Sequence, residues 1–235
     1  MQKRRSGGYM SRGEQVAGTV LFLLYLLVLP FAVGPLFGLV ELLLGLTLSA
    51  ATETLIYYYA LLAVTVIVFH GFLVRTSQRL LDNLDGAVKT LLAGLVALYG
   101  LNELVYRLIH TAVGSRTNLN DITISARIEG APHATLLIVV FLAPFVEEVL
   151  FRGLVFGNLK DRSRTVAYLV SCLLFALLHV WQFAVASRDV TYFLLMAQYL
   201  VPGLVLAWAF EHSGTLWTSV ALHATANALS VWTMM

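Results

Sequence analysis

The chain has 235 residues, of which 59% are hydrophobic and only 12% are charged, and its mean hydropathy is +0.83. Soluble globular domains carry about 25% charged residues, so this composition indicates a protein embedded in a membrane. The formal net charge of +2 offers no basic excess for binding nucleic acid. The single cysteine, Cys172, excludes a disulfide framework and a cysteine-based metal site.

The N-terminal segment 1–16 is basic and rich in glycine, and we expect it to be a cytoplasmic tail. The apolar run that follows is too long for the core of a signal peptide and lacks a small-residue cleavage site, so it is predicted to be a retained first span. Proline and glycine residues interrupt this run at Pro30, Gly34, Pro35 and Gly38. It is therefore either one kinked span or a span followed by a re-entrant piece.

Seven apolar runs are long enough for the ~20 residues that a tilted helix needs to cross the hydrocarbon. They lie near 17–40, 55–75, 88–109, 134–157, 166–186, 191–210 and 215–233. The predicted fold class is all-α: a polytopic membrane protein of about seven transmembrane helices with a polar site buried in the bundle. We divide the chain into the tail 1–16, N-terminal transmembrane helices and loops at 17–133, and a core at 134–235 that carries the polar motifs described below.

Basic residues predict the orientation, because cytoplasmic loops carry an excess of lysine and arginine. Three segments that share one side in a seven-span topology hold Lys3, Arg4, Arg5, Arg12, Arg75, Arg79, Lys89, Lys160, Arg162 and Arg164. The loops of the opposite side hold Arg116, Arg127 and Arg188. We therefore expect an integral membrane protein with a cytoplasmic N-terminus, and the short loops favour a prokaryotic cell membrane. The polar stretch 110–133 is predicted to be an extracytoplasmic loop with a short surface helix.

Three ionisable residues, Glu147, Glu148 and Arg152, lie inside the apolar run 136–157. Each costs about 2.5–3.5 kcal/mol to insert at the centre of a membrane helix, so such residues call for partners and indicate function. Positions i and i+4 share a helix face, so Glu148 and Arg152 are predicted to pair. Glu147 diverges from Glu148 by about 100° and remains available for chemistry.

Two later apolar runs contain further polar residues, namely His179 in one and His223 with Asn227 in the other. His223 and Asn227 share a helix face by the same i,i+4 rule. Counted from the basic side, Glu147 lies about ten residues, or roughly 15 Å, inside the membrane. The two histidines lie at similar depths. These depths are compatible with one cluster reached from the cytoplasmic face.

The polar residues fall into three ordered motifs: EEVLFR at 147–152 fits EExxxR, FALLH at 175–179 fits FxxxH, and HATAN at 223–227 fits HxxxN. In this order and on three apolar helices they resemble the CAAX-protease and bacteriocin-processing family of intramembrane endopeptidases, also called Abi or CPBP, which includes the type II CAAX prenyl endopeptidases. The resemblance covers about residues 134–230.

This resemblance implies hydrolysis of a peptide bond in a membrane-associated or lipidated protein or peptide. Glu147 would activate a water with His179 beside it, while His223 and Asn227 would face the developing oxyanion. Glu148 and Arg152 would hold the local structure. The partners implied are membrane lipid and a membrane-embedded or lipidated peptide substrate, with no nucleic acid.

The requirement for a metal stays open at this point. Glu147, His179 and His223 are a ligand set typical of catalytic Zn²⁺, but they come from three helices without an HExxH pairing, and the family has been described both as metal-dependent and as metal-free. Two other functions use the same buried polar cluster: a small transporter, in which it would form an ion pathway, and a non-catalytic immunity or binding scaffold. Internal inverted repeats would favour the transporter, and the sequence shows none.

Overall fold

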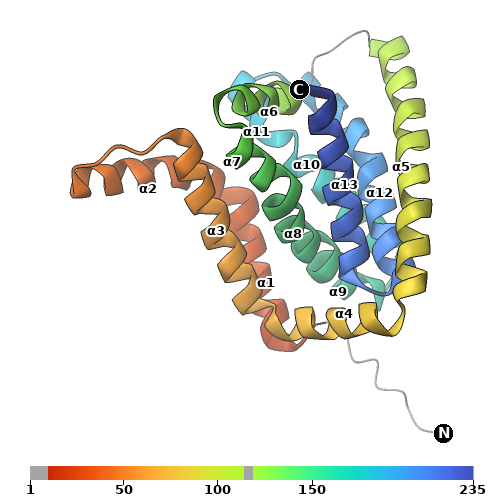
Figure 1. Ribbon diagram of the computed structural model, residues 1–235. Helices are drawn as coiled ribbons and strands as arrows, with labels where there is room; N and C mark the ends of the chain where they lie inside the picture. The colour runs from red at the N-terminus through yellow and green to blue at the C-terminus, as the bar shows by residue number, and fades with distance from the viewer. Residues whose placement is uncertain (1–9, 114–118, 235) are drawn as a thin grey trace, which may run out of the picture.

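The computed structural model describes residues 10–113 and 119–234, and all of its elements in these ranges are helices (Figure 1). The predicted all-α fold class is therefore confirmed. Four of the basic residues used above to predict the orientation, Lys3, Arg4, Arg5 and Arg116, lie outside the described residues.

The helices follow one another with short connections. In chain order they are α1 (Arg12–Leu23), the π-helical η1 (Leu24–Val28), α2 (Leu29–Leu44), α3 (Ala50–Val68), α4 (His70–Asp82), α5 (Leu84–Val113), α6 (Leu119–Gly130), α7 (Pro132–Leu136), the π-helical η2 (Leu137–Leu142), α8 (Ala143–Glu148), the π-helical η3 (Val149–Phe156), α9 (Gly157–Lys160), α10 (Arg164–Leu178), α11 (Trp181–Ser187), the 3₁₀-helical η4 (Val190–Leu195), α12 (Met196–Ser213) and α13 (Leu216–Met234). Helix α6 supplies the helix expected within the polar stretch 110–133.

Five helical runs of the described chain are long and apolar enough to cross a membrane: Arg12–Leu44, Ala50–Val68, Leu84–Val105, Pro132–Lys160 and Tyr192–Ser213. Helices α10 and α11, bent by 42° at their junction, form a sixth when taken together. The seventh predicted span corresponds to α13, which is 19 residues long. It carries histidine, asparagine, serine and threonine, which lower its hydropathy. The prediction of about seven spans thus agrees broadly with the structure.

The first apolar run divides into two parts. Helix α1 packs in the bundle, whereas α2 projects away from it (Figure 1), and none of the residues of α2 is buried. The change falls at η1, which ends two residues before Pro30, and proline has no N–H to continue a regular helical hydrogen-bond ladder. Helix α2 ends at Gly45, whose φ of 65° lies in the left-handed region that favours glycine. The run is therefore a span followed by an apolar arm outside the bundle.

Polar contacts join several helix ends at one edge of the bundle, which we call the basic edge. Arg75 pairs with Glu14 at 2.8 Å, which ties α4 to α1. The hydroxyl of Thr76 accepts a hydrogen bond from the backbone N–H of Leu216 at the start of α13. Glu211, near the end of α12, pairs with Lys160 at 3.4 Å and with Arg164 at 2.9 Å. The ends that meet here are the start of α1, α4, the connection from α9 to α10, the end of α12 and the start of α13.

The run from α8 to η3 forms the centre of the bundle, and Val146, Val149, Leu150 and Phe151 are each fully buried in it. Around this run, α10 and α12 approach closely at Gly203, because a Cβ at that position would lie 3.3 Å from the backbone of Cys172 on α10. The helix that carries Glu147 and Glu148 is therefore enclosed by its neighbours, and its polar side chains must find partners inside the protein.

Candidate active site

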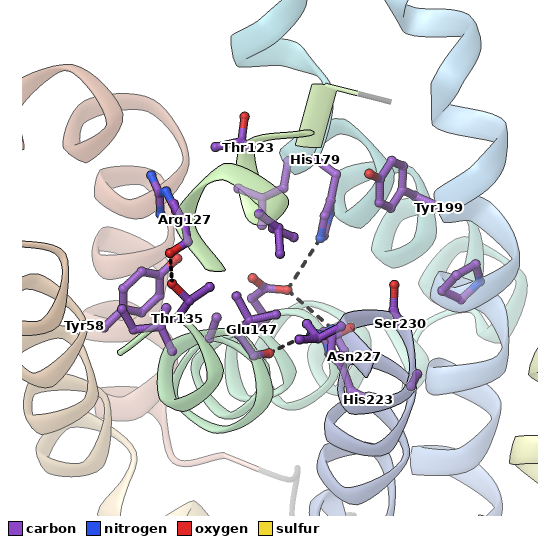
Figure 2. A pocket seen from close by; sticks show the side chains of 18 of the residues that line it. Tyr58, Thr123, Arg127, Thr135, Glu147, His179, Tyr199, His223, Asn227 and Ser230 are labelled. Atoms are coloured by element: carbon purple, nitrogen blue, oxygen red, sulfur yellow. Dashed lines mark hydrogen bonds and ion pairs between the residues drawn. The ribbon is translucent and has the colours of Figure 1, made fainter. Parts of the chain in front are cut away.

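Three side chains from three helices meet around one carboxylate oxygen (Figure 2). Glu147 extends from α8, His179 follows the last turn of α10, and His223 extends from α13. The Nε2 atom of His179 lies 3.9 Å from Oε2 of Glu147, and the Nε2 atom of His223 lies 4.0 Å from the same oxygen. The structure thus brings together the three residues that the sequence placed at similar depths.

The other nitrogen of each imidazole is already hydrogen-bonded. Nδ1 of His179 lies 2.9 Å from the backbone carbonyl oxygen of Phe175, and Nδ1 of His223 lies 2.9 Å from Oε1 of Glu148. Carbonyl and carboxylate oxygens only accept hydrogen bonds, so each Nδ1 carries the proton. In a neutral ring the Nε2 atom then presents a lone pair. Two lone pairs and a carboxylate oxygen therefore converge, an arrangement that calls for a hydrogen-bond donor between them.

The predicted pairing of Glu148 with Arg152 is present and fully buried. Nη1 of Arg152 donates to Oε1 of Glu148 at 2.9 Å, and both side chains are 0% exposed. Nη2 of Arg152 donates to the carbonyl oxygen of Gly203 at 3.1 Å, and its guanidinium lies 4.4 Å from the ring centroid of Phe175. Because Oε1 of Glu148 also accepts from His223, this ion pair connects α8 and η3 to α12 and α13.

Asn227 lies one helical turn beyond His223 and borders the same cavity. Its Nδ2 donates to the carbonyl oxygen of Val139 at 2.9 Å. Val139 belongs to the π-helical η2. A side-chain amide carries two N–H groups, so one donor is used in this contact and the second is available for another partner. Asn227 can therefore both hold α13 against η2 and serve a bound group.

Two tyrosines beside the site were not predicted. The hydroxyl of Tyr25 donates to Oε1 of Glu147 at 3.4 Å, across 122 positions of sequence. Tyr25 lies in η1, and π-helical turns are frequent at functional sites. The ring of Tyr199 stacks on His179 with centroids 4.5 Å apart. A tyrosine in an apolar run looks the same in sequence whether it packs, anchors at an interface or serves a site, so no signal distinguished these two.

The site forms the floor of a cavity of about 1430 Å³. At the floor Glu147 is 7% exposed and His223 5%. The described wall residues come from the start of α3, the second half of α5, α6, α7, α11, the start of α12 and the end of α13. All of these segments lie away from the basic edge. The depth estimate from the sequence was compatible with substrate reaching Glu147 from the basic side. In the structure, however, the cavity extends from Glu147 toward the opposite end of the bundle.

The sequence left open a metal bound by Glu147, His179 and His223. In the part of the chain that the structure describes, no three His, Cys, Asp or Glu side chains form a group that could hold a metal ion. The three candidate ligands share a centre, but at Nε2–Oε2 separations of 3.9 and 4.0 Å they do not form a metal-ligand group as placed.

Comparisons with known proteins agree with the three motifs. Residues 129–229 match the model of a family described as type II CAAX prenyl endopeptidase Rce1-like. The UPF0177 protein YxdF of Lactococcus lactis subsp. lactis (strain IL1403) is 29% identical over 86 residues, which are 37% of this chain and 42% of that protein. The match thus spans less than half the length of that curated relative. No solved structure matches the chain. The family resemblance is confirmed for the segment that carries the motifs.

Proposed function

We propose that this chain, whose residues 129–229 belong with the type II CAAX prenyl endopeptidase Rce1-like proteins, is an intramembrane endopeptidase. It would hydrolyse a peptide bond in a membrane-associated or lipidated protein or peptide. The observation that carries the proposal is the position of Glu147, whose Oε2 faces Nε2 of His179 and of His223 at the floor of the cavity.

A water between Oε2 of Glu147 and Nε2 of His179 has two hydrogens, one to donate to each acceptor. Glu147 takes one of these protons as the water oxygen attacks the substrate carbonyl carbon, and His179 holds the water in line through its Nε2 atom. The C–O bond that forms leaves a tetrahedral oxyanion. Glu147 then returns the proton to the leaving nitrogen as the C–N bond breaks, and the products are a carboxylic acid and an amine.

The oxyanion needs donors on its own side of the carbonyl. Asn227 offers the N–H of its amide that Val139 does not occupy. His223 offers a donor at Nε2 only as an imidazolium, since its Nδ1 proton is bound to Glu148. We assign the oxyanion site to these two residues, where one preorganised donor typically contributes about 10²–10³ in turnover.

The transporter alternative needs an open path past the cluster, and in this helix the buried ion pair of Glu148 and Arg152 fills that position. Below Glu147, toward the basic edge, the described chain continues with the fully buried side chains of Val149, Leu150 and Phe156. The cavity lining does not include these residues. A closed floor with a carboxylate at its base suits a reaction site better than an ion pathway.

The test compares the full chain with two matched variants in detergent, using a mixture of quenched fluorescent peptides with apolar centres as the probe. Glu147→Gln keeps the shape of the side chain but cannot accept a proton from water, so cleavage should stop. Glu103→Gln is the control, because Glu103 is an exposed glutamate that pairs with Arg107 on α5. Cleavage by wild type and Glu103→Gln but not by Glu147→Gln supports the proposal. Equal cleavage by all three proteins would overturn the assignment of Glu147.

A further inference from the structure

Basic residues are concentrated at one end of the bundle in three dimensions as well as in sequence. The described members of this group are Arg12, Arg75, Arg79, Lys89, Lys160, Arg162 and Arg164. They lie at the helix ends and connections that the contacts of Glu14, Thr76 and Glu211 bring together. The described basic residues near the other end of the bundle are Arg107, Arg127 and Arg188. By the positive-inside rule, the basic edge faces the cytoplasm.

The cavity occupies the half of the bundle remote from that edge. Its described wall includes exposed residues at the far helix ends, among them Ser49, Arg127, Gly130, Ser230 and Trp232. Its floor consists of buried residues, among them Glu147, Phe175, Leu206 and His223. Exposure thus increases from the reacting carboxylate toward the end that carries few cations. Figure 1 shows the same arrangement, with α6 and the C-terminal end of α13 at the end opposite to α4.

We infer that the site receives its substrate from the extracytoplasmic side of the membrane, as a peptide segment that is secreted or held at the outer face. The inference rests on the proposed function and adds the side of entry and therefore the substrate class. Helix α4 and the connection from α9 to α10 lie on the cytoplasmic side and take no part in substrate entry.

The depth of the site sets how much peptide must enter. From His223 to Trp232 the helix α13 advances nine residues, which is about 13 Å. An extended peptide covers about 3.3 Å per residue, so about four residues separate the outer edge of the cavity from the bond that is cut. A substrate must therefore present an unfolded segment, because a folded domain would not reach Glu147.

Cysteine labelling tests the side of entry without relying on activity. In a Cys172→Ala background, single variants Ala134→Cys, Ser187→Cys and Asp161→Cys are treated with a membrane-impermeant maleimide in right-side-out and inside-out vesicles. Ala134 lines the cavity, Ser187 is exposed at the cavity end, and Asp161 is exposed at the basic edge. We expect Ala134→Cys and Ser187→Cys to react in right-side-out vesicles and Asp161→Cys in inside-out vesicles.

The opposite pattern, with Ala134→Cys reacting only in inside-out vesicles, would overturn the inference and place the substrate in the cytoplasm. Labelling of Ala134→Cys from neither side would also overturn it, since the cavity would then not open to water outside. The orientation of each vesicle preparation is established independently, with a marker enzyme of known sidedness, while Ser187→Cys and Asp161→Cys report which end of the bundle each side exposes.

A cleavage assay separates this inference from the proposed function. A lysine-flanked, quenched fluorescent peptide that cannot cross the membrane is added to the same two kinds of vesicle, each holding the wild-type chain. Faster cleavage in right-side-out vesicles, with the difference abolished by detergent, supports entry from outside. Faster cleavage in inside-out vesicles contradicts the side of entry but keeps the peptidase. Absence of cleavage in detergent contradicts the peptidase, while the labelling pattern still decides which side the cavity faces.

Discussion

Glu148 and His223 lie 75 positions apart in the sequence and are joined by a hydrogen bond of 2.9 Å between Oε1 and Nδ1. This contact gives the two adjacent glutamates different tasks. Glu148 binds His223 and Arg152 inside the protein, while Glu147 faces the cavity. The orientation of His223 toward Glu147 therefore depends on a carboxylate that does not itself border the cavity.

Loss of Arg152 should destabilise the protein. Removing one partner of a buried ion pair leaves the other charge uncompensated, at a cost of about 3–5 kcal/mol. Arg152→Ala should lower the melting temperature and the folded yield in detergent, together with activity. Arg107→Ala is the matched control, because Arg107 forms an exposed i,i+4 pair with Glu103 and should change stability by at most about 1 kcal/mol. A normal melting temperature with no cleavage in Arg152→Ala would instead place Arg152 in the chemistry.

Glu147 and His179 should act on the same step. If both hold the same water, Glu147→Gln and His179→Ala should each reduce turnover severely, and the double variant should be little worse than either. The measurement is a double-mutant cycle on kcat with the fluorescent peptide probe. Losses that add in the double variant would show that the two residues serve different steps.

Asn227 should contribute to turnover more than to substrate binding. Asn227→Ala removes an oxyanion donor, so kcat should fall by about 10²–10³ with a small change in KM. Because Asn227 also holds Val139, the melting temperature is measured in parallel. Thr225→Ala, two residues away on α13, is the control; its hydroxyl binds the carbonyl oxygen of Ala221 in its own helix. A drop in kcat that merely follows the loss of folded protein would argue for a structural role alone.

Tyr25 should position Glu147 through its hydroxyl. Tyr25→Phe keeps the buried ring and removes one hydrogen bond, which is worth about 0.5–1.5 kcal/mol, or roughly two- to tenfold in kcat. KM and the melting temperature should stay near those of the wild type. Tyr168→Phe serves as the control, since it removes a tyrosine–glutamate hydrogen bond at the basic edge, where Tyr168 contacts Glu211. An unchanged kcat in Tyr25→Phe would show that the hydroxyl of Tyr25 does not position Glu147.

Turnover should survive prolonged chelation. The described residues around Glu147 do not form a metal-ligand group as placed, and in the proposed step the carboxylate of Glu147 is the base that activates the water. Activity is measured after dialysis against a chelator and compared with metal analysis of the same sample. Loss of turnover that one equivalent of Zn²⁺ restores would refute the metal-free step and assign Glu147, His179 and His223 to a metal site.

The sequence by itself determined the features that follow from local rules. Apolar runs of about twenty residues predict membrane helices, and the i,i+4 spacing places Glu148 beside Arg152 in any helix that contains them. The three ordered motifs were sufficient to identify the family resemblance that the match over residues 129–229 confirms. None of these inferences depends on which helices are in contact in the folded protein.

Only the tertiary structure decided the relations between helices. Helical periodicity places Glu147 on a face but does not say that Tyr25 of η1 or the stacked pair of His179 and Tyr199 lies against that face. Hydropathy also treats both halves of a span alike, so the direction in which the cavity extends was not available from it. These relations depend on how close-packed helices fit together, which is set by the shapes of many side chains at once rather than by the spacing of a few.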